Sequence, residues 1–193
     1  MKKKLRISYT LLNLWRSGKV DDSIVYYFKL AQISDPYMDE GKKWDKKVNE
    51  CVLHTKNLPV EFGATKLIDP KVQEKWEIDF MDRFSLVGVP DIVDSPTLYE
   101  IKTGNSKDSG DYCNDFQVGM YLLLADKLGK KIDKAVILHY DQYKKELDKS
   151  LIWNTEYERK RAENFILSIS PDIYTYFDQN NLWDFQDRLP IDM

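Results

Sequence analysis

The stretch Gly88–Gly104, GVPDIVDSPTLYEIKTG, is the part of this chain that decides its fold. It predicts two short strands joined by a turn at Ser95-Pro96. Counting outward from that turn, Asp91 faces Glu100 on the neighbouring strand. Opposed side chains on paired strands have Cβ atoms about 4.5–5.5 Å apart. Two carboxylates at that separation repel each other unless a cation lies between them, so the stretch predicts a cation site.

The second strand also carries a lysine beside the acidic pair. Because strand side chains alternate, Glu100 and Lys102 share one face while the side chain of Ile101 points to the core. The backbone carbonyl of Ile101 could still reach a cation held by Asp91 and Glu100, and oxygen-only ligands suit Mg²⁺ or Mn²⁺. A bound metal lowers the pKa of its water from ~15.7 towards roughly 7. Lys102 could then orient that water or stabilise charge on a phosphate, which predicts phosphodiester cleavage.

Two local alternatives stay open from the sequence. Proline is disfavoured at the third position of a type I turn, so the loop around Pro96 could be wider than two residues. A one-residue slip in strand pairing would move Asp91 to the opposite face. Taken alone, Glu100-Ile101-Lys102 is also typical of an ordinary half-exposed strand.

A following helix contributes two polar side chains. An apolar helix is expected over residues 116–127, capped by Asn114 or Asp115 and closed by Gly129. Gln117 and Tyr121 are four residues apart and therefore lie on one face of it. Either they complete the site, or they mark a helix edge that faces solvent.

The rest of the chain predicts an α/β fold. Helices are expected over residues 8–18, 22–33 and 36–58. An antiparallel meander is expected over residues 72–80, 84–93 and 97–103, followed by a loop over 104–115. Beyond the helix over 116–127 we expect a strand over 135–140, a helix over 155–169 opened by a Thr155 capping box, and a helical tail over 173–185. This order predicts one mixed β-sheet flanked by helices in a single domain, 1–193, made of a helical segment 1–58, a core 70–170 and a C-terminal helical tail 171–193.

Composition narrows the class of protein. The 193 residues are 42% hydrophobic and 13% aromatic, enough for a packed core. The net charge of −3 gives no overall signal for nucleic acid, although short lysine runs could form a local basic rim. The two cysteines form no C-x-x-C pair, and no apolar run is long enough to span a bilayer. We therefore expect an intracellular protein with no membrane partner.

The motifs G-x-P-D, E-x-K-T-G and Q-x-x-x-Y, in this order, resemble those of the PD-(D/E)XK nuclease superfamily. The resemblance is to its RecB-like exonuclease branch and covers residues 88–121 specifically. It implies a restriction-endonuclease-like core with an N-terminal helical segment. It also implies that Asp91 and Glu100 bind the metal, that Lys102 is catalytic, and that Gln117 and Tyr121 position DNA and the active site.

The chain departs from the branch in two places. A histidine metal ligand often follows an early-helix glycine by four residues, but here Asp45 follows Gly41. Asp45 could take over that role, or it could be an exposed residue that binds no metal. Neither His54 nor His139 lies at that position, and neither is favoured as a ligand. Several relatives hold an iron–sulfur cluster through four cysteines, which two cysteines cannot supply.

The resemblance therefore favours a Mg²⁺- or Mn²⁺-dependent DNA nuclease. Exonuclease action on single- or double-stranded DNA ends is expected, in recombination, repair or viral genome processing, with a recombination or replication protein as partner. The main alternative is a nuclease fold that binds DNA or protein without cutting. A restriction-type endonuclease is a third option, although no separate recognition domain is evident in the sequence.

Overall fold

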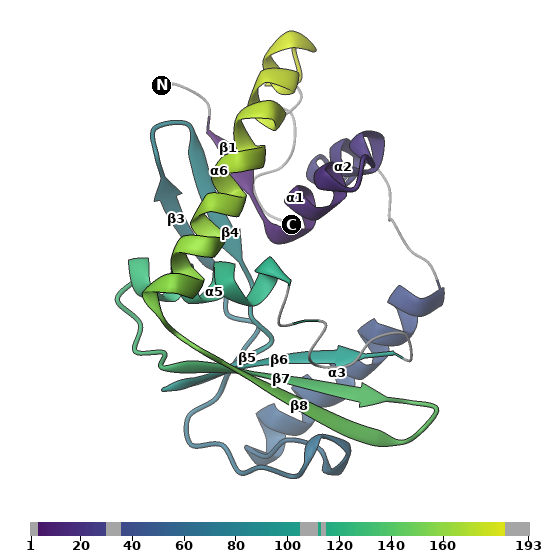
Figure 1. The fold of residues 1–193 in the computed structure, drawn as a ribbon. Helices are drawn as coiled ribbons and strands as arrows, with labels where there is room; N and C mark the ends of the chain where they lie inside the picture. Colours follow the sequence, from purple (N-terminus) through teal and green to yellow (C-terminus); the bar gives the residue numbers. More distant parts are fainter. Residues whose placement is uncertain (1–3, 30–35, 105–111, 113–114, 184–193) are drawn as a thin grey trace.

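The computed structural model describes residues 4–29, 36–104, 112 and 115–183 (Figure 1). Its elements are, in order, β1 (Leu5–Ile7), α1 (Tyr9–Arg16), α2 (Val20–Tyr27), α3 (Pro36–Thr55), the 3₁₀ helix η1 (Val60–Phe62), β2 (Lys71–Val72), β3 (Trp76–Phe80), β4 (Phe84–Gly88), β5 (Ile92–Asp94), β6 (Thr97–Thr103), α5 (Phe116–Lys127), β7 (Lys134–Asp141), β8 (Glu146–Trp153) and α6 (Glu156–Gln179). In the described part of the chain, no helix combines the length and apolar character that a membrane crossing requires.

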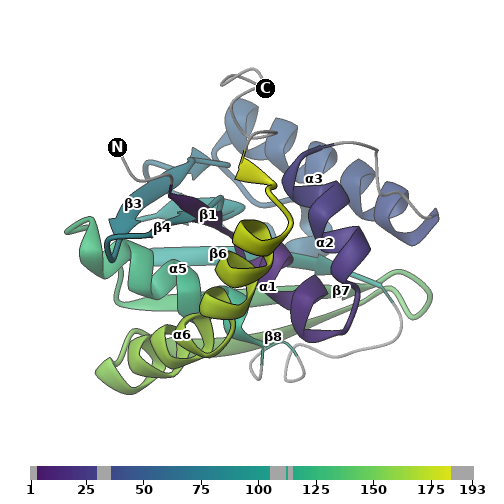
Figure 2. The same cartoon turned by 90° about the horizontal axis from the view of Figure 1, so that it is seen from above.

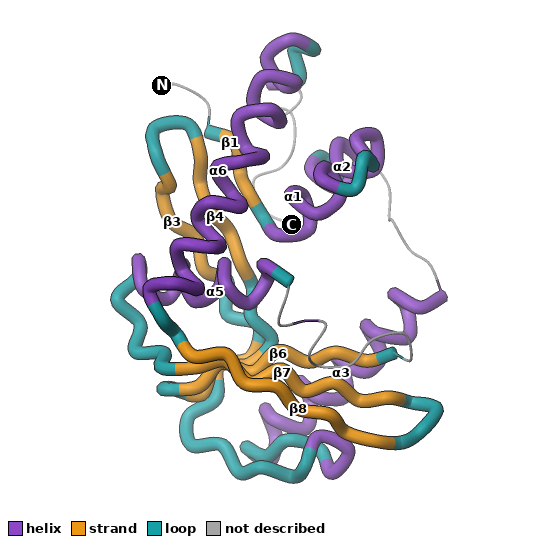
Figure 3. Tube along the Cα trace, viewed as in Figure 1, coloured by secondary structure: helices purple, strands orange, loops and turns teal. Residues whose placement is uncertain are grey.

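The strands form two mixed sheets. In the first, β4 pairs in parallel with β1 and antiparallel with β3. The second has the order β2-β5-β6-β7-β8, and only its β6–β7 pair is parallel. Figure 3 shows β6, β7 and β8 side by side below the strands of the first sheet. The expected mixed α/β class is confirmed, with its strands divided over two sheets.

The expected three-stranded meander is wrong. Residues 84–93 form β4 and β5, which belong to different sheets, and residues 72–80 divide in the same way into β2 and β3. The first break contains Pro90, which has no N–H to donate to a strand ladder. The second contains Gln73, whose φ of 49° is incompatible with an extended strand. Val89 continues the apolar run across the first break, so the hydrophobic pattern did not reveal it, whereas the second break, residues 73–75, is wholly polar.

Two strands were not expected at all. β1 lies within the segment expected to be wholly helical, and its Leu5 and Ile7 are fully buried. β8 is an edge strand in which Ile152 alone is buried, and its charged side chains suit an exposed edge. Because β8 lacks apolar alternation, its pairing with β7 rather than its own pattern makes it a strand.

The helix starts follow the sequence signals. The side chains of Ser8, Asp115 and Thr155 cap α1, α5 and α6 by accepting backbone N–H groups of the first turn. The helix expected over 116–127 is confirmed with those bounds. The helix expected over 22–33 instead ends at Tyr27, and residues 30–35 lie outside the described part. Most of the expected loop over 104–115 also lies outside it.

The two C-terminal helices expected from the sequence are one helix, α6, with Pro171 inside it. The buried stripe runs without interruption through the proline, from Ile166 and Ile169 to Ile173 and Phe177. Burial of that stripe offsets the hydrogen bond that proline cannot donate, so the helix continues.

Replacement of Pro171 by alanine is expected to stabilise the protein by about 1–3 kcal/mol, because Pro171 is exposed and its ring contributes no core packing. Urea unfolding followed by circular dichroism measures this. The matched variant Asp172→Ala changes a neighbouring exposed residue and should shift stability little. A loss of stability in Pro171→Ala would show that the proline supports the helix.

Two core clusters lie on opposite faces of the five-stranded sheet. α5 covers one face and α3 the other (Figure 1). In the first cluster, α1, α5 and α6 pack against the three-stranded sheet and against the face of the five-stranded sheet that α5 covers. α6 runs alongside α5 (Figure 2). The second packs Val48 and Val52 of α3 against Ile101 and Leu138. Side chains of β6 therefore alternate between these faces, and Leu98 and Ile101 belong to different clusters.

Candidate active site

Asp91 lies immediately before β5. The register of β5 and β6 pairs Ile92 with Tyr99, so one further step brings Asp91 opposite Glu100. The turn between the strands lies at Ser95-Pro96, whose peptide bond is cis, as in type VI turns. The predicted register is confirmed, and the one-residue slip does not occur.

The Asp91 carboxylate is anchored to the neighbouring strand. Its Oδ2 accepts a hydrogen bond of 2.7 Å from the backbone N–H of Ile101. The Ile101 side chain points the other way, into the second core cluster, as the strand alternation predicts. The carboxylate is thus held at the start of β5 beside the strand that carries Glu100.

Glu100 and Lys102 form the centre of the site. The Glu100 side chain is 2% exposed, and its Oε1 accepts a 2.7 Å hydrogen bond from Lys102 Nζ. The other oxygen, Oε2, is buried and has no hydrogen-bond partner among the described residues. Burial of a carboxylate oxygen without a hydrogen-bond partner costs free energy of folding. This atom is therefore suited to bind a ligand that carries positive charge.

Gln117 and Tyr121 reach inward from α5. Lys102 Nζ donates to Gln117 Oε1 at 2.8 Å, and Gln117 Nε2 donates to the Tyr121 hydroxyl at 2.9 Å. The hydroxyl in turn donates to the backbone carbonyl of Val89 at 3.2 Å. A continuous chain of hydrogen bonds therefore fixes Lys102, and the alternative of a helix edge that faces solvent is wrong.

Gly88 permits this arrangement. A Cβ atom at Gly88 would lie 2.7 Å from Leu124 Cδ1 and 2.9 Å from two ring atoms of Tyr121. Those separations are far shorter than ordinary carbon contacts. The last residue of β4 must therefore be glycine for the Tyr121 ring to lie against the strand.

The carboxylates and the lysine shift one another's proton affinity. Burial and the neighbouring Glu100 charge raise the pKa of Asp91 well above its usual value. Burial also raises the pKa of Glu100, although the Lys102 ammonium opposes this. Burial would lower the pKa of Lys102, but the charges of Glu100 and Asp91 outweigh it and raise that pKa. Two carboxylates share one ammonium, so the cluster favours an additional cation.

Comparisons with known proteins give the fold. No family model matches this chain, and no curated protein matches it in sequence. Among solved structures, an alkaline exonuclease of Laribacter hongkongensis matches with a TM-score of 0.54 at 10% identity, covering 94% of both chains. A protein of Eubacterium rectale assigned as an exonuclease matches with a TM-score of 0.63 at 12% identity, covering 88% of this chain and 80% of its own. This chain therefore shares the fold of these two solved structures.

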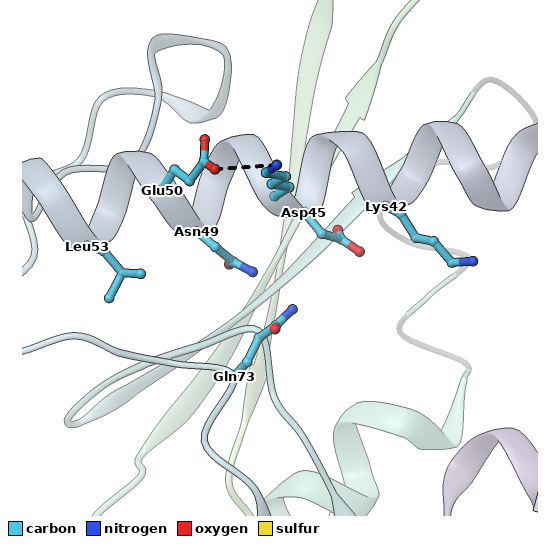
Figure 4. Close-up of a pocket in the computed structure, with 7 residues that line it drawn as sticks. Lys42, Asp45, Asn49, Glu50, Leu53 and Gln73 are labelled. Atoms are coloured by element: carbon cyan, nitrogen blue, oxygen red, sulfur yellow. Dashed lines mark ion pairs between the residues drawn. The ribbon is translucent and has the colours of Figure 1, made fainter. Parts of the chain in front are cut away.

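Asp45 of α3 lies at the edge of the site. Its charge raises the pKa of both Asp91 and Glu100, and burial raises its own pKa. Asp45 lines a hollow of about 330 Å³ between α3 and Gln73. Figure 4 shows its carboxylate pointing away from the helix on the side of Gln73. Among the described residues, no three His, Cys, Asp or Glu side chains converge as closely as ligands of one ion. Asp45 is thus electrostatically coupled to the pair without joining it.

His139 is a site neighbour that sequence reasoning set aside. It lies on β7 directly beside Lys102 of β6, is 3% exposed, and has a buried Nε2 without a hydrogen-bond partner among the described residues. The Tyr112 ring lies next to both, 5.7 Å from the His139 ring and 5.6 Å from Lys102 Nζ. The only sequence signal was a histidine within an apolar strand. His54 lies exposed in the last turn of α3, as expected.

Proposed function

We propose that this protein is a metal-dependent DNA nuclease that acts as an exonuclease. The observation that carries the proposal is the unpaired buried Oε2 of Glu100, beside Asp91 and a fixed Lys102. A pair of carboxylates that can bind a metal ion, with a lysine beside it, is an arrangement suited to metal-assisted hydrolysis of a phosphodiester.

The donor set suits Mg²⁺ or Mn²⁺. Asp91 and Glu100 would hold the ion through their carboxylates, with the Ile101 carbonyl as a further oxygen ligand and Asp45 as a supporting carboxylate at the edge of the site. When bound, the ion would supply a Lewis acid for the phosphate and lower the pKa of a water. Lys102, held by Glu100 and Gln117, would neutralise a phosphate oxygen as charge develops there.

The solved neighbours support DNA as the substrate and exonuclease as the mode. Both are described as exonucleases, and the Laribacter hongkongensis enzyme was also solved in complex with dAMP. We assign this chain to the RecB-like exonuclease branch without an iron–sulfur cluster. Its setting would be recombination, repair or viral genome processing inside a cell, with a recombination or replication protein as partner.

A protein that binds DNA without cutting it is the second candidate. It is favoured by the ion pair between Lys102 and Glu100, which already neutralises one carboxylate, and by the position of Asp45 at the edge of the site. Metal affinity separates the two candidates, because the non-cutting protein does not need an ion at Asp91 and Glu100.

The test is incubation of the protein with linear and covalently closed circular DNA, with Mg²⁺, with Mn²⁺ and with chelator. We expect metal-dependent digestion of linear DNA to short products and intact circles. Cleavage of the circles would make the protein an endonuclease. DNA binding with no cleavage in either metal, and no Mn²⁺ binding by calorimetry, would favour the second candidate.

Asp45→Ala is expected to weaken Mn²⁺ affinity about 10- to 100-fold, as loss of a supporting group in a metal site does. Isothermal titration calorimetry measures this without relying on cleavage. Glu50→Ala is the matched control, because Glu50 is an exposed acid of the same helix that pairs with Lys46 at 3.8 Å. Equal Mn²⁺ affinities in the two variants would show that Asp45 does not support the metal site.

A further inference from the structure

A second cavity adjoins the candidate active site. It has a volume of about 260 Å³ and lies between the start of α1, α2, the end of β4 and α5. α1 and α5 contact each other. The residues that matter for its chemistry are Ser8, Tyr9, Tyr26, Val89, Gln117 and Tyr121.

Gln117 connects this cavity to the site. Its amide oxygen accepts from Lys102 Nζ, while the same side chain lines the cavity together with Tyr121, to which it is hydrogen-bonded. A phosphate bound at Asp91 and Glu100 would therefore be separated from the cavity only by the side chain of Gln117. A group attached to that phosphate could enter it.

The lining selects a flat, neutral group. Three tyrosines line the cavity, and none of its described lining residues carries a charge. A phosphate would need a cationic partner, whereas every nucleic acid base has a face that stacks on an aromatic ring. The volume suits a single small group rather than a base pair, because pockets for drug-sized ligands begin at about 300 Å³.

Polar atoms at the rim can meet the edge of a base. The hydroxyls of Tyr26 and Ser8 lie 3.3 Å apart, and Tyr121 donates to the Val89 carbonyl. Tyr26 is 38% exposed and Val89 is 41% exposed, so this side of the cavity opens to solvent. Rotatable hydroxyls accept or donate, which makes such a rim tolerant of sequence.

We propose that this cavity holds the unpaired base of the terminal nucleotide of a DNA strand, while the adjoining phosphate lies at Asp91 and Glu100. The inference rests on the proposed nuclease function and names its substrate, a single-stranded or frayed end. An internal base within a duplex stays stacked between its neighbours and cannot enter, so the cavity favours action at ends.

The test uses DNA oligonucleotides that carry the fluorescent base 2-aminopurine at the terminus or at an internal position. Binding is measured with Ca²⁺, a hard cation that takes the same oxygen ligands. We expect quenching by the tyrosines for the terminal base only. Tyr26→Ala should reduce that quenching and raise the Kd for binding of the DNA end about 10-fold. Tyr26→Phe, which keeps the aromatic ring, should retain the quenching. Tyr143→Ala, which removes a tyrosine that is 76% exposed outside the cavity, should match wild type.

A terminal abasic nucleotide completes the experiment. Weaker binding of the abasic end supports the proposal. Equal binding of abasic and normal ends overturns it, as does an affinity set by a terminal phosphate alone. If DNA is cut but the terminal base is not quenched, the base site fails and the nuclease function stands. If the base is quenched and DNA is not cut with any metal, the nuclease function fails and the base site stands.

Discussion

Lys102→Ala is expected to lower kcat for DNA cleavage about 1,000-fold with little change in KM, because one charge-stabilising group contributes that much. Lys102 Nζ lies 2.7 Å from Glu100 Oε1 and 2.8 Å from Gln117 Oε1, so both its charge and its position are lost. Steady-state kinetics on linear DNA in Mg²⁺ measures the effect. Lys160→Ala, an exposed lysine of α6 paired with Glu163, is the control.

The same substitution has an expected effect on stability that does not depend on cleavage. Without the ammonium, the buried Glu100 carboxylate and the half-buried Asp91 carboxylate have no partner of opposite charge, which costs about 3 kcal/mol in the metal-free protein. Mg²⁺ should restore more stability to Lys102→Ala than to wild type. Thermal unfolding with and without Mg²⁺ measures this, and an equal shift in both proteins would contradict a metal site at these carboxylates.

Gly88→Ala is expected to lower kcat about 100-fold, since a displacement of about 1 Å in a positioning group has that effect. The new Cβ would lie 2.9 Å from the Tyr121 ring, so the ring must move away from β4. Tyr121 holds Gln117, and Gln117 holds Lys102, so the displacement reaches the lysine. Kinetics of the variant against wild type gives the loss.

The Gly88→Ala protein should remain folded, with a stability loss of about 1–3 kcal/mol from overpacking. Gly41→Ala is the matched control for stability, because its Cβ would meet nothing closer than Thr103 Oγ1 at 3.9 Å. That helical glycine should tolerate alanine with unchanged or slightly higher stability. Full activity in Gly88→Ala would show that the Tyr121 hydrogen bonds do not position Lys102.

The parts of the site predicted correctly are those set by short-range geometry. The pairing of Asp91 with Glu100 follows from one turn, and the shared face of Gln117 and Tyr121 follows from helix periodicity. Strand alternation likewise separates Ile101 from its neighbours. Each relation spans a few residues of one element or hairpin, where backbone geometry leaves little freedom.

Other features could not be predicted because they depend on contacts between distant segments. His139 lies beside Lys102 through the parallel pairing of β6 and β7, and no turn fixes the register of a parallel pair. α6 passes through Pro171 because a buried stripe on both sides holds it. At Pro171 packing outweighed a local signal, whereas at His139 there was no local signal to follow.

The sequence by itself determined the hairpin with its acidic pair and lysine, the capped starts of three helices and the mixed α/β class. Only the tertiary structure decided that the strands divide into two sheets, that β8 forms an edge, and that α5 brings Gln117 to Lys102 while Asp45 remains at the rim. The physical reason is the range of the forces involved. Turn and helix geometry act between near neighbours in the chain, whereas burial of apolar surface joins segments that the sequence separates.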